Sequence, residues 1–226
     1  MRTISSIVEA IIAQSPFYAE AIAEGIVNNA EIARRIKPLV EKRLLEDVSE
    51  AAVSMALHRL EKTMKRPETT GILPRISDIT VRSNLVEFVF PNAEDMFSVV
   101  DEVSRLARKR KDAFVNFSRG LYGSLLIVSK EFEKDAARAA RRARAERVSG
   151  LSAITMRLPD ECVEMPGVYY PLLKAIAWEG ISFVEVMSID TEFSIIFKDE
   201  DVDRAFSVLK RITAAATTSM LPSGVV

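Results

Sequence analysis

The sequence predicts an α+β protein in which a small all-helical domain precedes two ferredoxin-like (βαββαβ) repeats. Two observations support this prediction. Apolar residues recur with the helical period of about 3.6 up to residue 66, and the period changes to two, typical of strands, after residue 72. The second half of the chain then repeats the order of strands and helices in the first, at an offset of 69 residues.

Composition excludes several classes of protein. The 226 residues carry 31 Lys and Arg against 32 Asp and Glu, so the overall charge gives no attraction to nucleic acid or anionic membranes. The single cysteine, Cys162, excludes an intrachain disulfide and a multi-cysteine metal site. No apolar run reaches the roughly 20 residues of a membrane span, and the amino terminus has the period of a helix rather than of a signal peptide. We therefore expect a cytoplasmic protein without membrane contact.

Four helices are expected in the first domain, residues 1–70. The first has an apolar stripe from Ile4 to Ile12, and Pro38 is expected to divide the third, with a further short helix behind it. The stretch KRPETTG, residues 65–71, has the composition of a linker. The N-caps expected for the second, third and fourth helices are Ser15, Asn28 or Asn29, and Ser49.

The first repeat is expected over residues 72–147. Two alternating stretches, ISDITVR and LVEFVFP, predict strands, and Asn92 is expected to cap the helix that follows. AFVNFS and GSLLIVS predict two more strands. A charged helix is expected at about residues 131–146. Its mixed basic and acidic side chains are typical of a solvated connecting helix.

The second repeat is expected over residues 148–215, with a tail at 216–226. Residues 114–137 align without a gap on residues 183–206. The start of the first repeat stays open: one register places VEFVF on ITMRL, and another places ISDITVR on LSAITMR. Two such repeats side by side would give an eight-stranded, largely antiparallel sheet with helices on one face.

A Pro-Gly pair stands before a predicted helix in the stretch MPGVYYPLLKAIAWEGISFVEV, residues 165–186. Gly167 permits a ligand to approach the backbone closely, and the first turn of a helix accommodates a carboxylate through its unpaired N–H groups and its dipole. Because Pro171 lacks an amide hydrogen, we expect the helix to begin at about Val168. The alternative is that the Pro-Gly pair only shapes the loop.

The stretch from Pro166 to Phe206 resembles an ACT domain of the aspartate kinase type. It has Pro-Gly-Val, a helix, a Gly-Ile pair opening a strand, a Ser-containing turn and an acidic start to the last helix. The resemblance extends over about residues 75–215, although Asn92-Ala93 replaces Pro-Gly in the first repeat. It implies an amino-acid effector held where two domains meet, and a homodimer.

The resemblance also implies which residues bind the effector. Ser182 stands where many such domains have Asn, which leaves the identity of the ligand open. The residues carried over by matching position are Met165, Pro166, Gly167, Val168, Ser182, Met187 and Ser188.

An enzyme is not expected. The chain has only eight glycines, and neither G-x-G-x-x-G nor G-x-x-x-x-G-K-[ST] occurs. The phosphate-binding loop that a kinase domain needs is therefore not found in the sequence. The only histidine, His58, is expected on a solvated helix face, and Cys162 has no partner for a dyad or a zinc site. The acidic run at residues 199–203 fits a divalent cation or, more simply, the start of a helix. We expect no catalytic residue, metal or cofactor.

Residues 29–66 resemble a helix-turn-helix, whose second helix enters the major groove of DNA. Two observations oppose DNA binding. Residues 1–66 carry ten basic and nine acidic side chains, and Ser49 follows Ile36 by thirteen residues where the motif has a turn of about three or four. The residues expected to contact nucleic acid are Arg34, Arg35, Lys37, Ser49, Ser54, His58, Arg59 and Lys62.

The sequence therefore predicts a regulatory protein that senses a small metabolite, an amino acid first of all, through paired ACT-like domains. Its helical head would bind DNA as a transcriptional regulator. The alternative is a non-enzymatic interaction or allosteric module whose head docks on a protein partner. Both would act by a change in how rigid domains are juxtaposed.

Overall fold

The computed structural model describes residues 3–64, 71–91, 96–110, 113–141 and 145–218. The chain divides into two compact units, Met1–Glu68 and Thr69–Val226, here called the helical unit and the sheet unit. Most of the expected linker at 65–71 and the expected cap Asn92 lie outside the described residues. Within the described part, no helix has the length and apolar character required to span a membrane.

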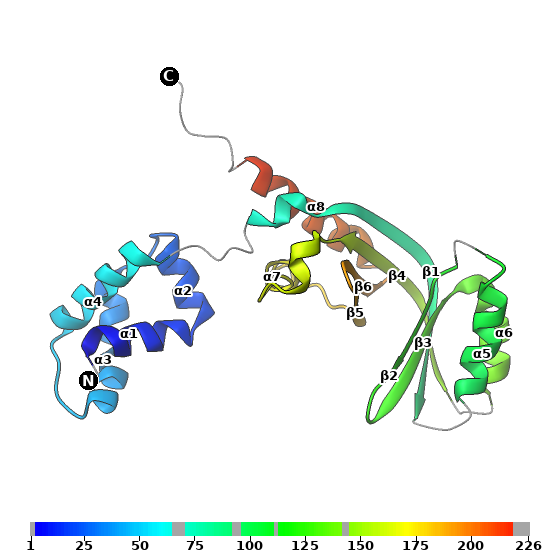
Figure 1. Ribbon diagram of the computed structural model, residues 1–226, viewed down its shortest axis with the longest axis horizontal. Coiled ribbons are helices and arrows are strands. Elements are labelled where there is room, and N and C mark those ends of the chain that lie inside the picture. The colour runs from blue at the N-terminus through cyan, green and yellow to red at the C-terminus, as the bar shows by residue number, and fades with distance from the viewer. Residues whose placement is uncertain (1–2, 65–70, 92–95, 111–112, 142–144, 219–226) are drawn as a thin grey trace, which may run out of the picture. The chain divides into compact units, whose positions relative to one another are not determined.

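The helical unit contains four α-helices in the described residues (Figure 1). Ser15, Asn28 and Ser49 each accept hydrogen bonds from first-turn amides, which confirms them as N-caps. At the first helix, Thr3 and Ser6 form a capping box that the sequence analysis did not include. Apolar faces of all four helices form one core. The helices are α1 (Ile4–Ala13), α2 (Pro16–Ala23), α3 (Asn29–Leu44) and α4 (Glu50–Thr63).

The prediction that Pro38 divides the third helix is wrong. Helix α3 runs unbroken through this proline, because Ile36 and Val40 on either side of it are both buried in the core. Their packing outweighs the hydrogen bond that a proline removes from a helix. The helix ends at Leu45, whose φ of 61° is left-handed, so only residues 45–49 link α3 to α4.

The sheet unit is built on one antiparallel sheet of six strands in the described residues, in the order β2-β3-β1-β4-β6-β5 (Figure 1). The α+β class and the antiparallel pairing are confirmed, and the expectation of eight strands is wrong. The strands are β1 (Ser77–Pro91), β2 (Val115–Arg119), β3 (Gly123–Ser129), β4 (Glu146–Arg157), β5 (Glu185–Ile189) and β6 (Glu192–Lys198).

The strand count falls short because β1 and β4 each run through both halves of the sheet. The stretches ISDITVR and LVEFVFP belong to the single strand β1. Its first part, residues 77–82, pairs with residues 153–157 of β4, and its second part pairs with β3 and with the start of β4. Register shifts interrupt the pairing near Asn84 and Gly150, which have φ angles of 60° and 73°. Such bulges bend strands, and here they let the sheet curl.

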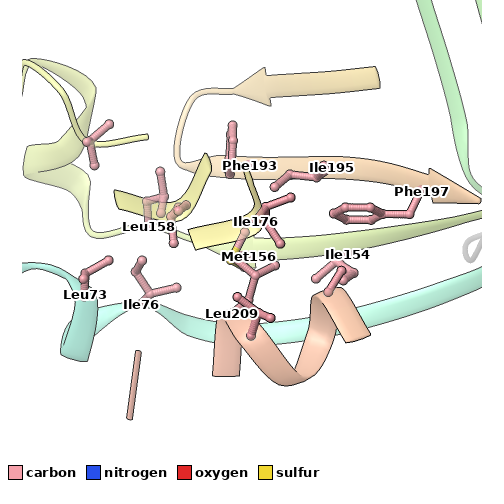
Figure 2. Packing of buried hydrophobic residues seen from close by; sticks show 14 of the residues in the cluster. Leu73, Ile76, Ile154, Met156, Leu158, Ile176, Phe193, Ile195, Phe197 and Leu209 are labelled. Atoms are coloured by element: carbon pink, nitrogen blue, oxygen red, sulfur yellow. The ribbon is translucent and has the colours of Figure 1, made fainter. Parts of the chain in front are cut away.

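Two helices cover each half of the sheet. Helices α5 (Met96–Ala107) and α6 (Glu133–Ala140) pack on the half formed by β2, β3 and β1. Helices α7 (Tyr170–Trp178) and α8 (Val202–Thr218) pack on the half formed by β4 and β6. Figure 2 shows the core between α7, α8 and the strands β4 and β6. Leu73 and Ile76, just before β1, pack into this core.

Two pairs of element boundaries keep the 69-residue offset of the aligned stretches. Strands β3 and β6 begin at Gly123 and Glu192, 69 residues apart, and helices α6 and α8 begin at Glu133 and Val202, also 69 residues apart. The offset is not kept by α5 and α7, which begin 74 residues apart, and the charged helix expected at 131–146 is shorter than expected. After a 3-10 turn, α6 ends at Ala140 and β4 begins at Glu146, where residues 146–149 pair with β1. Strand pairing outweighs the helical charge pattern there.

The face of the sheet opposite these helices carries a third apolar cluster. Side chains alternate along a strand, so Leu85 and Ala153 lie on the opposite side from Val86 and Ile154, which pack under the helices. We call this side the reverse face. Its fully buried members are Leu85, Ile127, Leu151, Ala153 and Ile196, with Phe114, Leu125, Val184 and Met187 partly buried around them.

Candidate functional site

The predicted ligand loop lies between a short 3-10 helix, Asp160–Val163, and helix α7. Gly167 has a φ of 77°, in the left-handed region where a side chain is strained. Its carbonyl accepts a hydrogen bond from the Tyr170 N–H at 3.0 Å, which closes a turn before the helix. Helix α7 thus begins at Tyr170 and not at the expected Val168, because the turn at Gly167 takes up the intervening residues.

The loop presents backbone to solvent while its flanking side chains are anchored. Pro166 and Gly167 are exposed, Val168 is buried in the core, and Met165 packs partly against the same core. The N-cap residue of α7, Tyr169, makes no side-chain capping hydrogen bond. The start of this helix therefore has no side-chain acceptor at its cap, and an anion from solution suits such a position.

Tyr169 links the loop to the neighbouring strand. Its hydroxyl lies 2.7 Å from the Ser188 hydroxyl, and its ring stacks on Phe193 with the centroids 4.4 Å apart. This contact brings Ser188 of β5 to the loop, as the resemblance implies. The sequence analysis did not select Tyr169, although an aromatic residue with a polar tip beside a proposed ligand loop was a usable signal.

The structure does not bring all seven predicted ligand residues together. Ser182 is exposed in the segment before β5. Met187 packs on the reverse face, whereas its neighbour Ser188 meets Tyr169 on the helix side. Adjacent residues of a strand point to opposite faces, so these two side chains serve different surfaces.

A cavity of about 180 Å³ opens on the reverse face, between the start of β2 and strands β5 and β6. A second cavity of about 460 Å³ adjoins it and shares Ile189 and Glu192. The hydroxyls of Thr155 and Ser194 are 2.7 Å apart nearby. The smaller cavity is lined by Ala113, Phe114, Val115, Asn116, Met187, Ile189, Glu192 and Ser194.

Glu87 of β1 is a buried carboxylate on this same face. Only 2% of the Glu87 residue is exposed, and its Oε2 atom has no hydrogen-bond partner among the described residues. Burial, and to a lesser extent the nearby charge of Glu185, raise the pKa of Glu87 to about 6. Burial also raises the pKa of Glu185. The alternation of LVEFVFP, with Val86, Phe88 and Phe90 on the core side, favours an exposed position for Glu87, and the structure differs.

The residues expected to contact DNA lie on α3 and α4, and several are paired with acidic neighbours. Arg34 and Arg35 contact Glu31 at 2.5 and 2.9 Å, and Lys37 contacts Glu41 at 2.6 Å. These contacts hold the pKa values of Glu31 and Glu41 below their usual range. The basic side chains of α3 are thus partly neutralised within their own helix.

The predicted nucleic-acid residues of α4 have mixed surroundings. Ser49 accepts a hydrogen bond from the Ala52 amide as the N-cap, and Ser54 is half-buried. His58 is exposed, as expected, with its Nδ1 atom 3.4 Å from Glu61. Arg59 and Lys62 are also exposed, so they leave α4 with a small basic surface.

The helical unit also has an apolar groove. The groove is about 270 Å³ in volume and lies between α2 and the start of α3, where Phe17 is 67% and Ile26 is 79% exposed. Exposed side chains of this size in one place are typical of a docking surface. The groove is lined by Phe17, Tyr18, Ala21, Ile26, Val27, Asn28, Glu31, Ile32 and Arg35.

Cys162 is buried in the core of the sheet unit, and burial raises the pKa of its thiol. A protonated, enclosed thiol is a poor nucleophile. Across the described ranges, no group of three or more His, Cys, Asp or Glu side chains is placed to hold a metal ion.

Solved structures that resemble this chain include two aspartate kinases with a TM-score of 0.50. The kinase from Clostridium acetobutylicum is 9% identical, and the match covers 61% of this chain and 34% of that chain. The kinase from Synechocystis is 13% identical, and the match covers 62% of this chain and 27% of that chain. Likeness at such low identity concerns the fold alone, and it supports the ACT-type fold expected from the sequence.

The regulatory subunit of aspartate kinase from Thermus thermophilus also matches, with a TM-score of 0.46 and 13% identity. That match covers 61% of this chain and 97% of the subunit. No family model matches the sequence, and no curated protein matches it.

Proposed function

We propose that this chain is a non-enzymatic regulatory protein that senses an amino acid at the loop formed by residues 165–168. One observation carries the proposal: the left-handed Gly167 exposes backbone directly before the uncapped start of α7. A carboxylate bound there gains the favourable end of the helix dipole and contact with the exposed loop backbone, since the Tyr170 amide is already bonded to Gly167 and Pro171 has no amide hydrogen. Tyr169 and Ser188 add hydroxyl groups beside it.

The finer layout that we infer is two ferredoxin-like repeats that share their long strands. In the first repeat, residues 85–91 of β1 are flanked by β3 and by the start of β4, with β2 outside β3. In the second, the later part of β4 is flanked by β6 and by residues 77–82, with β5 outside β6. Both sets have the spatial strand order of a βαββαβ unit, although the fourth strand of the second set, residues 77–82, precedes that set in the chain. The proposed domains are residues 1–70, 72–147 and 148–215, and the last two exchange these outer strand segments.

Ligand binding in this proposal changes the output of the helical unit through the relative populations of two domain arrangements. The ligand shifts these populations only by the difference in its affinity for them. Strands β2 and β5 form the two ends of the sheet in the described residues, and a second copy of the chain would pair along such an edge to form the expected homodimer.

The helical unit would dock on a protein partner through the groove between α2 and α3. Exposed Phe17 and Ile26 favour this role, and the ion pairs of Arg34, Arg35 and Lys37 disfavour phosphate contact. DNA binding is the second candidate, favoured by the short link at residues 45–49, which removes the spacing objection raised from the sequence.

A thermal-shift screen of the whole chain against the twenty amino acids tests the sensing proposal. At about 100 times its Kd, a ligand specific for the folded state stabilises by about 2.7 kcal/mol, so one amino acid or a related group should raise the Tm by several degrees. The Gly167→Val variant should lose this shift, and Gly71→Ala, at a site with open space, should keep it. A flat screen, or a shift that survives Gly167→Val, would reject the proposed site.

Binding to random duplex DNA at increasing salt separates the two roles of the head. The docking role predicts no binding at 50 mM salt, whereas a DNA-binding head predicts binding that weakens linearly in log–log form as salt rises. Loss of binding in Arg59→Ala and Lys62→Ala variants would then assign the contact to α4, and the docking proposal would fail.

A further inference from the structure

We propose that the reverse face of the sheet holds a second binding site, specific for a small organic ammonium ion, between β2 and β5. This site is separate from the loop at residues 165–168, and neither its argument nor its test depends on amino-acid sensing.

The cavity of about 180 Å³ supplies the space. A water molecule occupies about 30 Å³ in the liquid, so the volume matches a group of about six waters or an alkylammonium ion of a few carbons. Phe114, Met187 and Ile189 provide apolar walls for a short alkyl chain. Glu192 and Asn116 provide oxygen acceptors, and none of the lining residues is Lys or Arg.

Two oxygen acceptors in this region lack partners. Oε2 of Glu87 and Oδ1 of Asn116 are both buried, and neither has a hydrogen-bond partner among the described residues. Unpaired buried acceptors are costly, and a carboxylate is the most costly of them. A primary ammonium ion carries three N–H donors, which is what a group of acceptors without donors requires.

Strand register places the orphaned carboxylate on the same face as the cavity, in one row with a residue of the cavity wall. Asn116 of the cavity wall is opposite Ile127 of β3, and Ile127 is opposite Glu87 of β1, so the three lie in one row on the reverse face. Strands are about 4.8 Å apart, so the row is about 10 Å long, within reach of extended side chains. Glu185 lies two residues before Met187 of the same wall and therefore shares its face.

The lining of the smaller cavity includes a carboxylate, that of Glu192, and no Lys or Arg side chain. Both influences on the Glu87 carboxyl, burial and the charge of Glu185, oppose its ionisation. With a pKa of about 6 the group is nevertheless mostly ionised at pH 7.5. Arg157 borders the adjoining larger cavity and is opposite Glu192 in the strand register, and Lys198 lies near Glu200 at 3.9 Å. A bound cation would relieve this charge, which gives the site its preference for ammonium over neutral ligands.

Methyl NMR of the whole chain with 13C-labelled methionines tests the site directly. Titration with propylammonium chloride at pH 7.5 should shift the Met187 methyl signal, assigned through a Met187→Leu variant, and leave that of Met55 in the helical unit unchanged. Sodium chloride at equal ionic strength and neutral 1-propanol should leave the Met187 signal in place. Equal shifts from 1-propanol, or no shift up to 100 mM propylammonium, would overturn the proposal.

Variants test the role of the carboxylates. Glu87→Gln should weaken propylammonium binding at least tenfold, and Glu185→Gln should weaken it several-fold, because each removes negative charge from the site. Glu9→Gln, which changes an exposed carboxylate of the helical unit, is the control and should bind like the parent. If Glu87→Gln fails to fold, Glu185→Gln decides the result. Undiminished binding in both variants, or in the one that folds, rejects the site.

Discussion

Glu87 is a carboxylate in a central strand of the sheet, where its neighbours on the two adjacent strands are apolar. It is flanked across the sheet by Ile127 and Val148. An alternating sequence such as LVEFVFP predicts that the polar positions meet water. The curl of the sheet overturns that expectation, since the reverse face is partly enclosed by its own edges and residue 87 is buried.

The raised pKa of Glu87 makes stability depend on pH. The folded protein keeps this proton up to about pH 6, whereas the unfolded chain releases it near 4.5, so stability falls as pH rises between these values. Glu87→Gln should raise the free energy of unfolding at pH 7.5 by about 1 kcal/mol, after allowing for solvent screening, and by nothing at pH 4.5. Urea unfolding at the two pH values measures this, and an equal effect at both would contradict it.

Gly167 gives a second prediction for a single residue. Its φ of 77° lies where any Cβ atom is strained, so Gly167→Ala should lower the free energy of unfolding by about 1–2 kcal/mol. Gly71→Ala is the control, because a Cβ atom there meets open space, and its effect should stay within about 0.5 kcal/mol. Urea titrations of the two variants compare them, and equal stabilities would mean that the loop does not require glycine.

At the scale of elements, caps and apolar stripes were predictable because they depend on neighbours in sequence. Ser15, Asn28 and Ser49 are N-caps, and the buried faces of α1, α3 and α4 follow the apolar period. What failed depends on distant contacts. The core packing of α3 carries it through Pro38, and pairing with β1 begins a strand at Glu146, the last residue of the expected charged helix.

The cap of α4 separates a structural role of Ser49 from a role in DNA binding. Its Oγ accepts from the Ala52 amide at 3.1 Å, so Ser49→Ala should destabilise the helical unit by about 1 kcal/mol, whereas Ser49→Asp should retain the cap. Urea unfolding followed by circular dichroism reports the difference. If both variants are as stable as the parent, the hydrogen bond contributes nothing and the side chain is available for another role.

The candidate site was predictable only in part for a similar reason. The matched positions located the loop, the left-handed Gly167 and the approach of Ser188 from the next strand. The reverse-face cavity was not predictable, because β2 and β5 come together only through the curl of a sheet whose bulges have no clear signature in the sequence. Of the predicted residues, only Met187 lies on that face.

At the scale of the whole molecule, the two long strands join both halves of the sheet unit. Leu126 lies in the core under α5 and α6, and Ile195 lies in the core under α7 and α8. Because β1 and β4 cross both halves, we expect these cores to unfold together. Leu126→Ala and Ile195→Ala should each cost about 2–5 kcal/mol and shift one shared transition. Near-ultraviolet and far-ultraviolet circular dichroism during urea unfolding measures this, and two separated transitions of the sheet unit would contradict it.

Because β1 runs through both halves of the sheet, proteolytic cleavage between the halves would expose parts of each. Residues 77–82 lie along the outer side of residues 153–157, and Leu73 and Ile76 fill part of the core beneath α8. A fragment that starts at β4 would lose both, leaving bare amide and carbonyl groups on a central strand and a gap in its interior. Such a piece would self-associate through the bared strand, so proteolytic clipping between α6 and β4 leaves two products that must stay together to remain soluble.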